Sequence, residues 1–445
     1  MAGRPSKRRT LAVWMNGEAV GHWTLAPEGH RFAYLESWLS SPSARAISLS
    51  MPLEQGTVPF AGTRVEAYFE NLLPESVAVR KRIAQKFGTS NATFDLLAHI
   101  GRDCVGAVQL LPLNVVPTGV HRIEAEPLTD DQVEALLDAT ISNTPLGLGD
   151  EDELRISIAG AQEKTALLRH EGRWCRPLGA TPTTHIFKLP MGDVGNMRAD
   201  FSTSVENEWL CAQIARAFGL DVAECEILRF GRHKVLSVER FDRMPFEGWL
   251  ARRPQEDFCQ ALGVPAERKY QEHGGPGMAD ILSVLRGSDR PKEDRLQFLA
   301  AQLLFWLLAA PDGHAKNFSI FLLPGSRFQL TPLYDIMSAW PIIGSGAHQF
   351  QWQKVKLAMA VRSKNNHYRM YDIQRRHWSA TASANALGTD FEPVIEDFVQ
   401  RTPEVVEAVQ RTLPAKFPTT VSDPIFQGLL NQAKRLAAGQ LSGTQ

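Results

Sequence analysis

The sequence predicts an α/β (α+β) lobe over residues 1–240 and a mainly α-helical lobe over residues 241–445. Up to about Phe241, short apolar runs with strand-like alternation are mixed with helical patterns. After Asp242, long apolar patterns with helical spacing dominate, at 278–285, 293–309, 391–400, 403–413 and 425–436. A mixed segment followed by a helical one is typical of two lobes with separate cores.

The first lobe contains a further division. Its strand-like runs lie at 11–15, 105–111, 166–168 and 235–238. A loose region with Pro112, Pro117 and Gly119 follows the second of these runs. We therefore expect an N-terminal module at about 10–115, separate from the segment that leads to residues 157–165.

Composition sets limits on partners. The chain has 445 residues, 44% of them hydrophobic, which is enough for substantial cores in two or three domains. Its 48 Lys and Arg nearly balance its 49 Asp and Glu, so the net charge is -1. No strong overall field attracts nucleic acid or membrane. Any DNA contact is expected to be local or through a partner.

Cysteine usage indicates a reducing compartment. The five cysteines are odd in number, widely spaced and mostly in apolar contexts, so we expect reduced core residues of a cytoplasmic protein. The basic segment 4–9 lacks the sustained apolar run of an export signal and is expected to be a short tail. No run has the length of a transmembrane helix, so we expect no membrane association.

Three polar residues in the second lobe have an informative spacing. Asp312 is followed five residues later by Asn317, and Asp335 comes after a hairpin-like interval. Phosphoryl transfer needs a carboxylate to orient the attacking hydroxyl and oxygen ligands to hold Mg²⁺. Asp312 can supply the orienting carboxylate, and Asn317 with Asp335 can supply the oxygen ligands for Mg²⁺.

The flanking sequence supports this interpretation. An apolar stretch at 298–310, ended by Pro311, predicts a buried helix. Two strand-like runs, 318–323 and 327–331, surround a Pro-Gly turn and predict a hairpin. This order is that of protein-kinase-like catalytic lobes, so we expect a bilobal kinase-like architecture. Asp312 and Asp335 could instead cap helices or close turns, but the fixed offset of Asn317 disfavours that alternative.

A second motif lies upstream. Strand-like runs flank a turn of small residues, Ala159, Gly160 and Ala161, which would let backbone N–H groups approach phosphates. Lys188 then lies within an apolar strand at 184–190, where it is either an outward-facing residue or a buried cation with an anionic partner. Glu208 is the candidate partner on the helix expected at 205–218, and Glu206 is its rival.

With these motifs the sequence resembles the HipA toxins, the serine/threonine kinases of bacterial type II toxin–antitoxin pairs. The resemblance runs from about Trp14 to the low 400s, and its central motifs are long and nearly gap-free. It is carried by the segments 70–76, 100–103, 155–165, 237–243 and 312–317.

The resemblance implies roles for individual residues. Asp312 resembles the catalytic base, and Asn317 and Asp335 resemble the Mg²⁺ ligands. The residues implied in ATP binding are the phosphate loop (Ile158, Ala159, Gly160, Ala161, Gln162, Glu163), the ATP lysine (Lys188), the segment between the lobes whose backbone would meet adenine (Glu239, Arg240, Phe241), and residues near the catalytic loop and metal site (His314, Lys316, Asn317, Tyr334, Asp335).

Ser157, at the head of the phosphate loop, resembles the family's autophosphorylated serine. In that family the modified loop leaves the ATP site and the kinase is silenced. About two added negative charges beside a triphosphate would favour this change. Without the resemblance, a strand-end serine that bonds its own turn would be the expected interpretation.

The resemblance also implies cofactors and binding partners, and two alternative functions remain to be weighed against it. The implied cofactors are ATP and Mg²⁺, and the implied partner is a HipB-like helix-turn-helix antitoxin dimer that connects the complex to operator DNA. The implied protein substrate is a translation enzyme such as glutamyl-tRNA synthetase. An idle kinase scaffold that acts as a corepressor is one alternative, disfavoured by the intact Asp312, Asn317, Lys188 and Asp335. A small-molecule or lipid kinase is the other, because His314 lies two residues after Asp312.

Overall fold

The computed structural model describes residues 8–141, 156–157, 162–194 and 198–439. The chain forms two compact units. Unit 1 consists of residues up to Leu189, Leu228–Glu267 and Ser319–Phe328, and unit 2 of Pro190–Ile227, Arg268–Phe318 and Gln329–Gln445. Both units are discontinuous in sequence, so the chain passes between them several times. The division expected at residue 240 stays a prediction.

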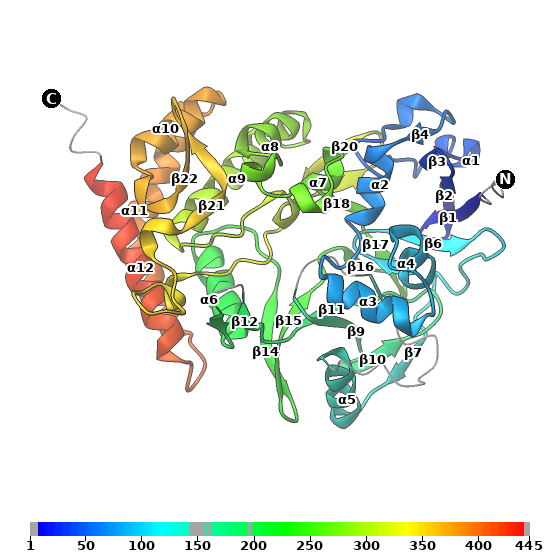
Figure 1. The fold of residues 1–445 in the computed structure, drawn as a ribbon, viewed down its shortest axis with the longest axis horizontal. Coiled ribbons are helices and arrows are strands. Elements are labelled where there is room, and N and C mark those ends of the chain that lie inside the picture. Colours follow the sequence, from blue (N-terminus) through cyan, green and yellow to red (C-terminus); the bar gives the residue numbers. More distant parts are fainter. Residues whose placement is uncertain (1–7, 142–155, 158–161, 195–197, 440–445) are drawn as a thin grey trace, which may run out of the picture. The chain divides into compact units, whose positions relative to one another are not determined.

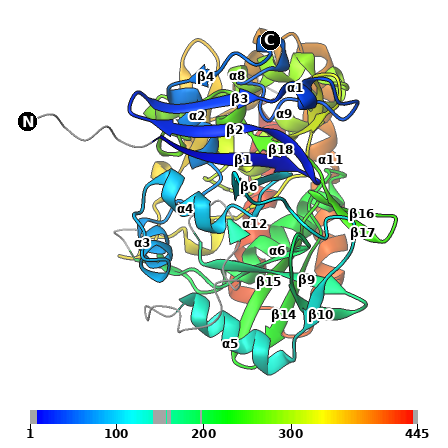
Figure 2. The ribbon, with the colours of Figure 1, turned by 90° about the vertical axis from the view of Figure 1, so that its right-hand side faces the viewer.

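Unit 1 begins with an antiparallel five-stranded sheet in the order β4-β3-β2-β1-β6. Figure 2 shows β1, β2 and β3 side by side, and β1 contains a bulge between Val13 and Trp14. Gly21 is required on β2, because a Cβ there would lie 2.4 Å from the Ala33 carbonyl oxygen. The strands are β1 (Arg9–Met15), β2 (Glu18–Ala26), β3 (Gly29–Tyr34), β4 (Phe60–Ala61) and β6 (Val108–Pro112).

Four helices accompany this sheet in the sequence, and the hydrophobic core includes residues of the sheet and of α1, α2, α3 and α4. Trp23 of β2 stacks on Phe69 of α2 with ring centroids 3.9 Å apart, and both side chains are fully buried. Such pairs add to the stabilisation that burial alone gives. The helices are α1 (Glu36–Leu39), α2 (Thr63–Glu70), α3 (Val77–Lys86) and α4 (Thr93–Ile100).

The second sheet of unit 1 has the order β14-β15-β11-β9-β10-β7. Helix α5 (Asp130–Ile141) contributes Val133 and Leu137 to the core of this sheet, beside Phe187 and Phe230. The predicted strand that contains Lys188 is present as β11, but it ends at Lys188, which the sequence had placed in the middle of a strand at 184–190. The strands are β7 (Ala125–Pro127), β9 (Lys164–His170), β10 (Arg173–Pro177), β11 (His185–Lys188), β14 (Cys225–Phe230) and β15 (His233–Glu239).

Shorter elements complete unit 1. β5 (Asp103–Cys104) pairs in parallel with β8 (Ile156–Ser157). The expected hairpin at 318–331 is present as β19 (Ser319–Leu323) and β20 (Arg327–Leu330), and β18 (Gln255–Asp257) pairs with β19. β16 (Arg243–Phe246) and β17 (Trp249–Arg252) form another hairpin, and α7 (Phe258–Ala261) begins with a capping box formed by Asp257 and Gln260.

A buried cluster of five charged side chains lies in unit 1. It contains Asp103 of β5, Asp242, and the arginines Arg240, Arg243 and Arg252, all less than a tenth exposed. Each arginine donates to or pairs with a carboxylate, at distances from 2.9 to 3.4 Å. Burial alone would raise the pKa of Asp103, but the three arginines outweigh it and hold the pKa far below its usual value. Both carboxylates therefore stay ionised and paired.

Unit 2 is organised around α9 (Pro291–Leu307), the buried helix that the sequence predicted. From Phe298 onward every residue of α9 is buried, as expected for a helix that is covered on all sides. α8, α11 and α12 pack against it, and Figure 1 shows α11 and α12 side by side. The other helices of the unit are α6 (Ser204–Ala217), α8 (Met278–Val284), α10 (Arg375–Ala384), α11 (Gly388–Arg411) and α12 (Thr419–Ala438).

The helical patterns at 391–400 and 403–413 are both helical, and they belong to one continuous helix, α11. Pro403 removes one backbone N–H without ending the helix. One apolar face, with Phe391, Ile395, Phe398 and Val406 buried, continues past the proline. Tertiary packing of that face outweighs the local cost of the proline.

Two short strand pairs also belong to unit 2: β12 (Gly192–Val194) with β13 (Ala199–Phe201), and β21 (Lys356–Arg362) with β22 (Asn366–Arg369). All five cysteines are free, and only Cys225 is not fully buried. Among the described residues, no helix combines the length and the apolar character needed to span a bilayer.

Glu256 of β18 is a second buried acid in unit 1, and it lacks an arginine partner. Its Oε1 accepts the N–H of Leu49 at 2.8 Å, while Oε2 is buried without a hydrogen-bond partner among the described residues. Burial raises the pKa of Glu256 to about 8. The side chain is therefore mostly protonated at neutral pH in the folded protein.

Glu256 is expected to make stability fall as the pH rises. Its pKa in the folded state exceeds the ordinary value of 4.5, so its stabilising contribution is complete below pH 4.5 and is lost as the pH rises through about 8. A Glu256→Gln variant should lose less thermal stability than the parent between pH 5 and 9, by roughly several degrees in Tm. Thermal unfolding followed by circular dichroism measures this, with the exposed Glu28→Gln as control. Parallel pH profiles of parent and Glu256→Gln would contradict the expectation.

Candidate active site

The loop that carries Asp312 begins at the end of α9. Ala309 adopts a left-handed conformation with φ 49°, which ends the helix. The N–H of Ala310 then donates to the Phe305 carbonyl at 2.7 Å. Gly313 is required in this loop, because a Cβ there would lie 2.2 Å from the Phe305 ring. Gln302 of α9 donates to the Gly313 carbonyl at 3.3 Å.

The last carbonyl groups of α9 have partners outside the helix. Helix ends leave such groups unpaired unless other segments supply donors. Here the donors come from the segment 338–340, shortly after Asp335. The bonds are Ser338 Oγ to the Leu308 carbonyl (2.5 Å), Trp340 Nε1 to the Leu307 carbonyl (3.1 Å) and the Ala339 N–H to the Ala309 carbonyl (2.9 Å). The end of α9 therefore holds the two acidic loops together.

Asn207 of α6 holds the same segment from another side. Its amide nitrogen donates to the Ser338 carbonyl, and its amide oxygen accepts the Ser338 N–H, each at 2.8 Å. The side chain is 3% exposed, so these bonds are shielded from water.

Asn317 and Asp335 are attached to the same loop. The Asn317 amide nitrogen donates to the Asp312 carbonyl at 2.7 Å, which leaves the amide oxygen directed away from that carbonyl. Tyr334, directly before Asp335, donates its hydroxyl to the Lys316 carbonyl at 2.8 Å. Asp335 has a φ of 63°, which is uncommon for a residue with a side chain and is found preferentially at functional sites.

The Asp312 carboxylate is about half exposed, at 55% of its side chain. Its Oδ1 accepts a hydrogen bond from the Tyr270 hydroxyl and lies 3.6 Å from His314 Nε2. The Tyr270 ring also meets the His314 ring edge to face, with centroids 5.0 Å apart. The Tyr270 hydroxyl thus orients one oxygen of the expected base.

His314 is 2% exposed, and its Nδ1 has no hydrogen-bond partner among the described residues. Burial lowers the pKa of His314 well below 6.5, and the nearby Lys269 and Lys316 lower it further, against the opposing charge of Asp335. The imidazole is therefore neutral at physiological pH. A phosphate contact by His314 would be a hydrogen bond from a neutral ring.

Unit 1 carries the expected phosphate-loop and lysine residues. Lys188 is 6% exposed and lies opposite Leu236 of β15 and Lys164 of β9. Gln162 donates to the Leu189 carbonyl at 2.5 Å, which connects the loop to the end of β11. Ile158, Ala159, Gly160 and Ala161 lie outside the described residues.

Two further contacts fix the ends of that loop. The Glu163 carboxylate pairs with Arg82 of α3 at 2.6 Å, so this side chain is engaged with α3. At the other end, the backbone of Ser157 is paired with Cys104 of β5. The strand β8 that carries Ser157 is therefore attached next to Asp103 of the buried cluster.

The segment expected to meet adenine follows β15. Glu239 is exposed, and Phe241 contacts the Phe321 ring edge to face at 5.8 Å. The Arg240 side chain is bound within the buried cluster, while its N–H donates to the Thr184 carbonyl at 2.9 Å. A nucleotide contact at Arg240 would use the backbone, as the sequence comparison implied.

Sequence reasoning missed several residues that hold these groups, namely Tyr270, Asn207, Ser338, Gln302 and Arg82. Tyr270 lies 42 positions before Asp312, and no spacing rule connects them. Glu206 and Glu208 are both buried on α6 of unit 2, and their suggested pairing with Lys188 stays a prediction.

Asn317 and Asp335 fit the requirements of Mg²⁺. They offer one amide oxygen and one carboxylate, both hard ligands, and Mg²⁺ typically binds few protein groups together with substrate phosphates. The bond from the Asn317 nitrogen to the Asp312 carbonyl selects the amide oxygen as the ligand atom.

Comparisons with known proteins identify the family. Residues 11–111 match the sequence profile of the HipA N-terminal domain, and residues 156–409 match that of the HipA-like C-terminal domain. The chain belongs to the HipA family. The putative kinase Y4mE of Sinorhizobium fredii is 40% identical over 342 residues, which cover 74% of this chain and 77% of the relative.

The serine/threonine-protein kinase toxin HipA of Shewanella oneidensis is 27% identical over 436 residues, which cover 92% of this chain and 91% of the toxin. A solved structure of Shewanella oneidensis HipA, in a complex with HipB and its operator DNA, matches this HipA-family chain with a TM-score of 0.77. The match has 24% identity and covers 96% of this chain and 97% of that one. The predicted family, fold class and enzyme class, a kinase, are confirmed.

Tyr270 is expected to act as a positioning residue for Asp312. A Tyr270→Phe variant removes the hydroxyl that holds Oδ1 and should lower kcat about threefold to tenfold, with little change in the KM for ATP. Steady-state kinetics over pH 6 to 9 measure both constants, with Tyr371→Phe as an exposed control. An unchanged kcat for Tyr270→Phe across this range would rule out the positioning role.

Proposed function

We propose that this chain is an ATP- and Mg²⁺-dependent protein serine/threonine kinase and the toxin of a type II toxin–antitoxin pair. Asp312 is the base that accepts the proton of the attacking hydroxyl, and Asn317 with Asp335 holds the metal. Lys188, residues 158–163 and the backbone of 239–241 contact ATP. Family membership and the kinase names of the relatives support the activity.

The observation that carries the residue assignment is the bond from Asn317 to the Asp312 carbonyl. This bond holds the half-exposed Asp312 carboxylate and the Asn317 amide oxygen, which could bind a metal, in one loop. The segment after Asp335 is hydrogen-bonded to the end of α9, from which that loop begins. A loop that only closes a turn does not need to bring these polar side chains together. Bound Mg²⁺ would supply charge neutralisation for the phosphates.

Each protein group then has a defined task. The Asp312 carboxylate is presented to solvent, where a substrate hydroxyl can approach, while the Tyr270 hydroxyl orients its Oδ1. His314, kept neutral by burial, places no positive charge beside Asp312 that would lower the proton affinity of its carboxylate. Lys188, buried among β-strands, supplies a positionally fixed cation for phosphate.

A solved relative supports the proposed partner, and the family resemblance of the sequence implies the proposed substrate. The matched toxin structure contains HipB and operator DNA, which supports a helix-turn-helix antitoxin dimer as the partner and DNA contact through that complex. A translation enzyme such as glutamyl-tRNA synthetase is the proposed protein substrate. Free thiols in all five cysteines agree with action in the cytoplasm.

We further propose that Ser157 is autophosphorylated and that the modification silences the kinase. Among the described residues, the pairing of β8 with β5 covers Ile156 and Ser157. Release of a short strand pair costs few backbone hydrogen bonds. A phosphate at this position would add about two negative charges beside the phosphate loop.

The central test is phosphotransfer by an Asp312→Asn variant. Loss of the base should lower transfer from γ-labelled ATP at least about 100-fold while ATP affinity measured by calorimetry is kept. The assay uses purified glutamyl-tRNA synthetase and, in parallel, lipid vesicles as acceptors, with the exposed Asp397→Asn as matched control. Full activity of Asp312→Asn would contradict the base assignment, and labelling of lipid alone would replace the protein-kinase proposal.

Autophosphorylation has its own measurement. After incubation with Mg-ATP, intact-mass and peptide mass spectrometry should find one phosphate on Ser157 in the parent and none in Asp312→Asn. The phosphorylated fraction should also bind ATP at least about tenfold more weakly, through like-charge repulsion. Phosphate found only at other serines, or undiminished ATP affinity of the modified protein, would refute the silencing role.

A further inference from the structure

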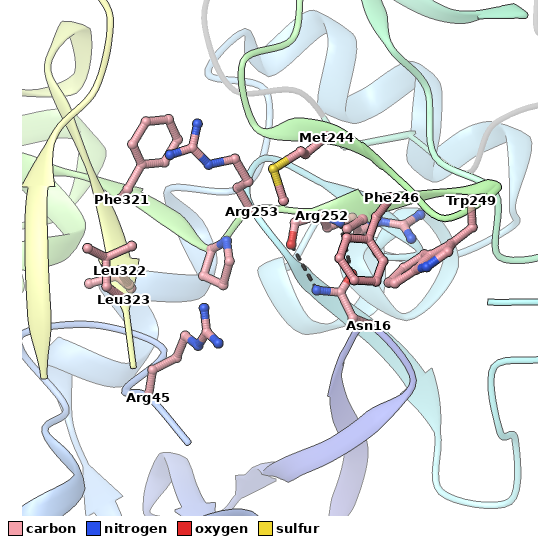
Figure 3. Close-up of a pocket in the computed structure, with 12 residues that line it drawn as sticks. Asn16, Arg45, Met244, Phe246, Trp249, Arg252, Arg253, Phe321, Leu322 and Leu323 are labelled. Atoms are coloured by element: carbon pink, nitrogen blue, oxygen red, sulfur yellow. Dashed lines mark hydrogen bonds between the residues drawn. The ribbon is translucent and has the colours of Figure 1, made fainter. Parts of the chain in front are cut away.

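A cavity of about 380 Å³ opens on unit 1, and none of its lining residues is assigned to phosphoryl transfer. Figure 3 shows it between the β16–β17 hairpin and β19, with Arg45 on one side and Arg253 on another. Its lining combines aromatic and aliphatic side chains with arginines, and no acidic residue contributes to it. Small-molecule sites typically have volumes of about 300–1,000 Å³ and mostly apolar walls with a few polar groups.

Two of the lining arginines form no direct ion pair among the described residues, although the more distant charges of Glu18 and Asp242 act on Arg45 and Arg253 respectively. Arg45 is half-buried, and its Nε donates to the Ser43 carbonyl at 3.0 Å. Arg253 is also half-buried and lies over the Phe321 ring, with its guanidinium carbon 3.6 Å from the centroid. Burial lowers the pKa of both arginines. Partly desolvated cations without an acidic partner are stabilised when an anion enters the cavity.

The opposite wall is aromatic and accessible. Phe246 and Met244 of β16 are 47% and 44% exposed, although both are large apolar side chains. Phe246 and Trp249 meet edge to face with centroids 5.9 Å apart, at the end of the same hairpin. A planar apolar group placed against these side chains would remove them from water.

The floor of the cavity is rigid. Asn16 exchanges two hydrogen bonds of 2.9 Å with the backbone of Arg252 (Figure 3). The Arg252 guanidinium bonds the Ala180 carbonyl and pairs with Asp103 of the buried cluster at 3.2 Å. Arg252 is thus neutralised by the protein itself, unlike Arg45 and Arg253. A preformed cavity avoids much of the ordering cost of binding.

We propose that this cavity binds a small aromatic carboxylate, with the carboxylate between Arg45 and Arg253 and the ring against Phe246 and Trp249. Guanidinium groups match a carboxylate in shape as well as in charge. The cavity volume accommodates a ring system of one or two rings. This site is independent of the kinase proposal, since none of its residues takes part in phosphoryl transfer.

The test compares 2-naphthoate with its neutral analogue 2-naphthamide, using calorimetry on the full-length chain. Naphthoate should bind one site per chain at least about tenfold more tightly than naphthamide, a factor typical of one charge-assisted pair. Arg45→Met and Arg253→Met should each weaken naphthoate about tenfold and leave naphthamide unchanged. Arg173→Met, which removes an exposed arginine elsewhere in unit 1, is the matched control.

A second readout does not depend on the arginine variants folding well. Naphthoate should change the tryptophan emission of the parent, and a Trp249→Leu variant should lose most of that change. The proposal is overturned by any of three results: no saturable binding at millimolar naphthoate, equal affinity for naphthamide, or unaltered affinity in a folded Arg45→Met variant.

Discussion

The buried pairing of Asp103 and Asp242 with three arginines is the constraint on which much of unit 1 depends. Three positive and two negative charges are shielded from water, a costly arrangement unless every group is paired and bonded. The cluster fixes β5, and β5 in turn pairs with the strand of Ser157. It also fixes the segment after β15, where Arg240 lies, and through Arg252 it forms the floor of the arginine-lined cavity. Removing the Asp103 carboxylate would leave Arg252 without its partner in the cluster, whereas Arg240 and Arg243 would keep Asp242.

In unit 2 the corresponding constraint is the end of α9. A fully buried helix cannot leave its last carbonyl groups to water, so the chain must supply donors from elsewhere. Ser338, Ala339 and Trp340 do so, and this requirement brings the segment after Asp335 to the loop of Asp312. The same hydrogen bonds therefore satisfy the last carbonyl groups of α9 and bring together the proposed metal-binding residues. The left-handed conformation of Asp335 is held by its neighbours on both sides.

Local patterns predicted the elements whose physics is local. The buried helix before Asp312, the hairpin after Asn317 and the strand that ends in Lys188 all follow from apolar runs bounded by proline and glycine, and the structure contains each of them. The separate helical patterns at 391–400 and 403–413 form one helix, because the continuous apolar face of α11 keeps the helix intact past Pro403. The two discontinuous units were also beyond sequence reasoning, since strand partners such as β18 and β19 lie about 65 positions apart along the chain.

The sequence by itself predicted the family and the α/β and helical character, which are confirmed, because these rest on motifs and apolar patterns that are local in the chain. It also suggested Asp312, Asn317 and Asp335 as site residues from their spacing, and these stay a proposal. Only the tertiary structure decided which side chains support them. Tyr270 on Asp312, Asn207 on Ser338 and Arg82 on Glu163 are contacts between residues far apart in the chain. Burial in the folded chain keeps His314 neutral. The fold also places Arg45 and Arg253 at a cavity that no acidic residue lines. The protonation state and the ion-pair partner of a side chain depend on the atoms around it, and these atoms come together only when the chain folds.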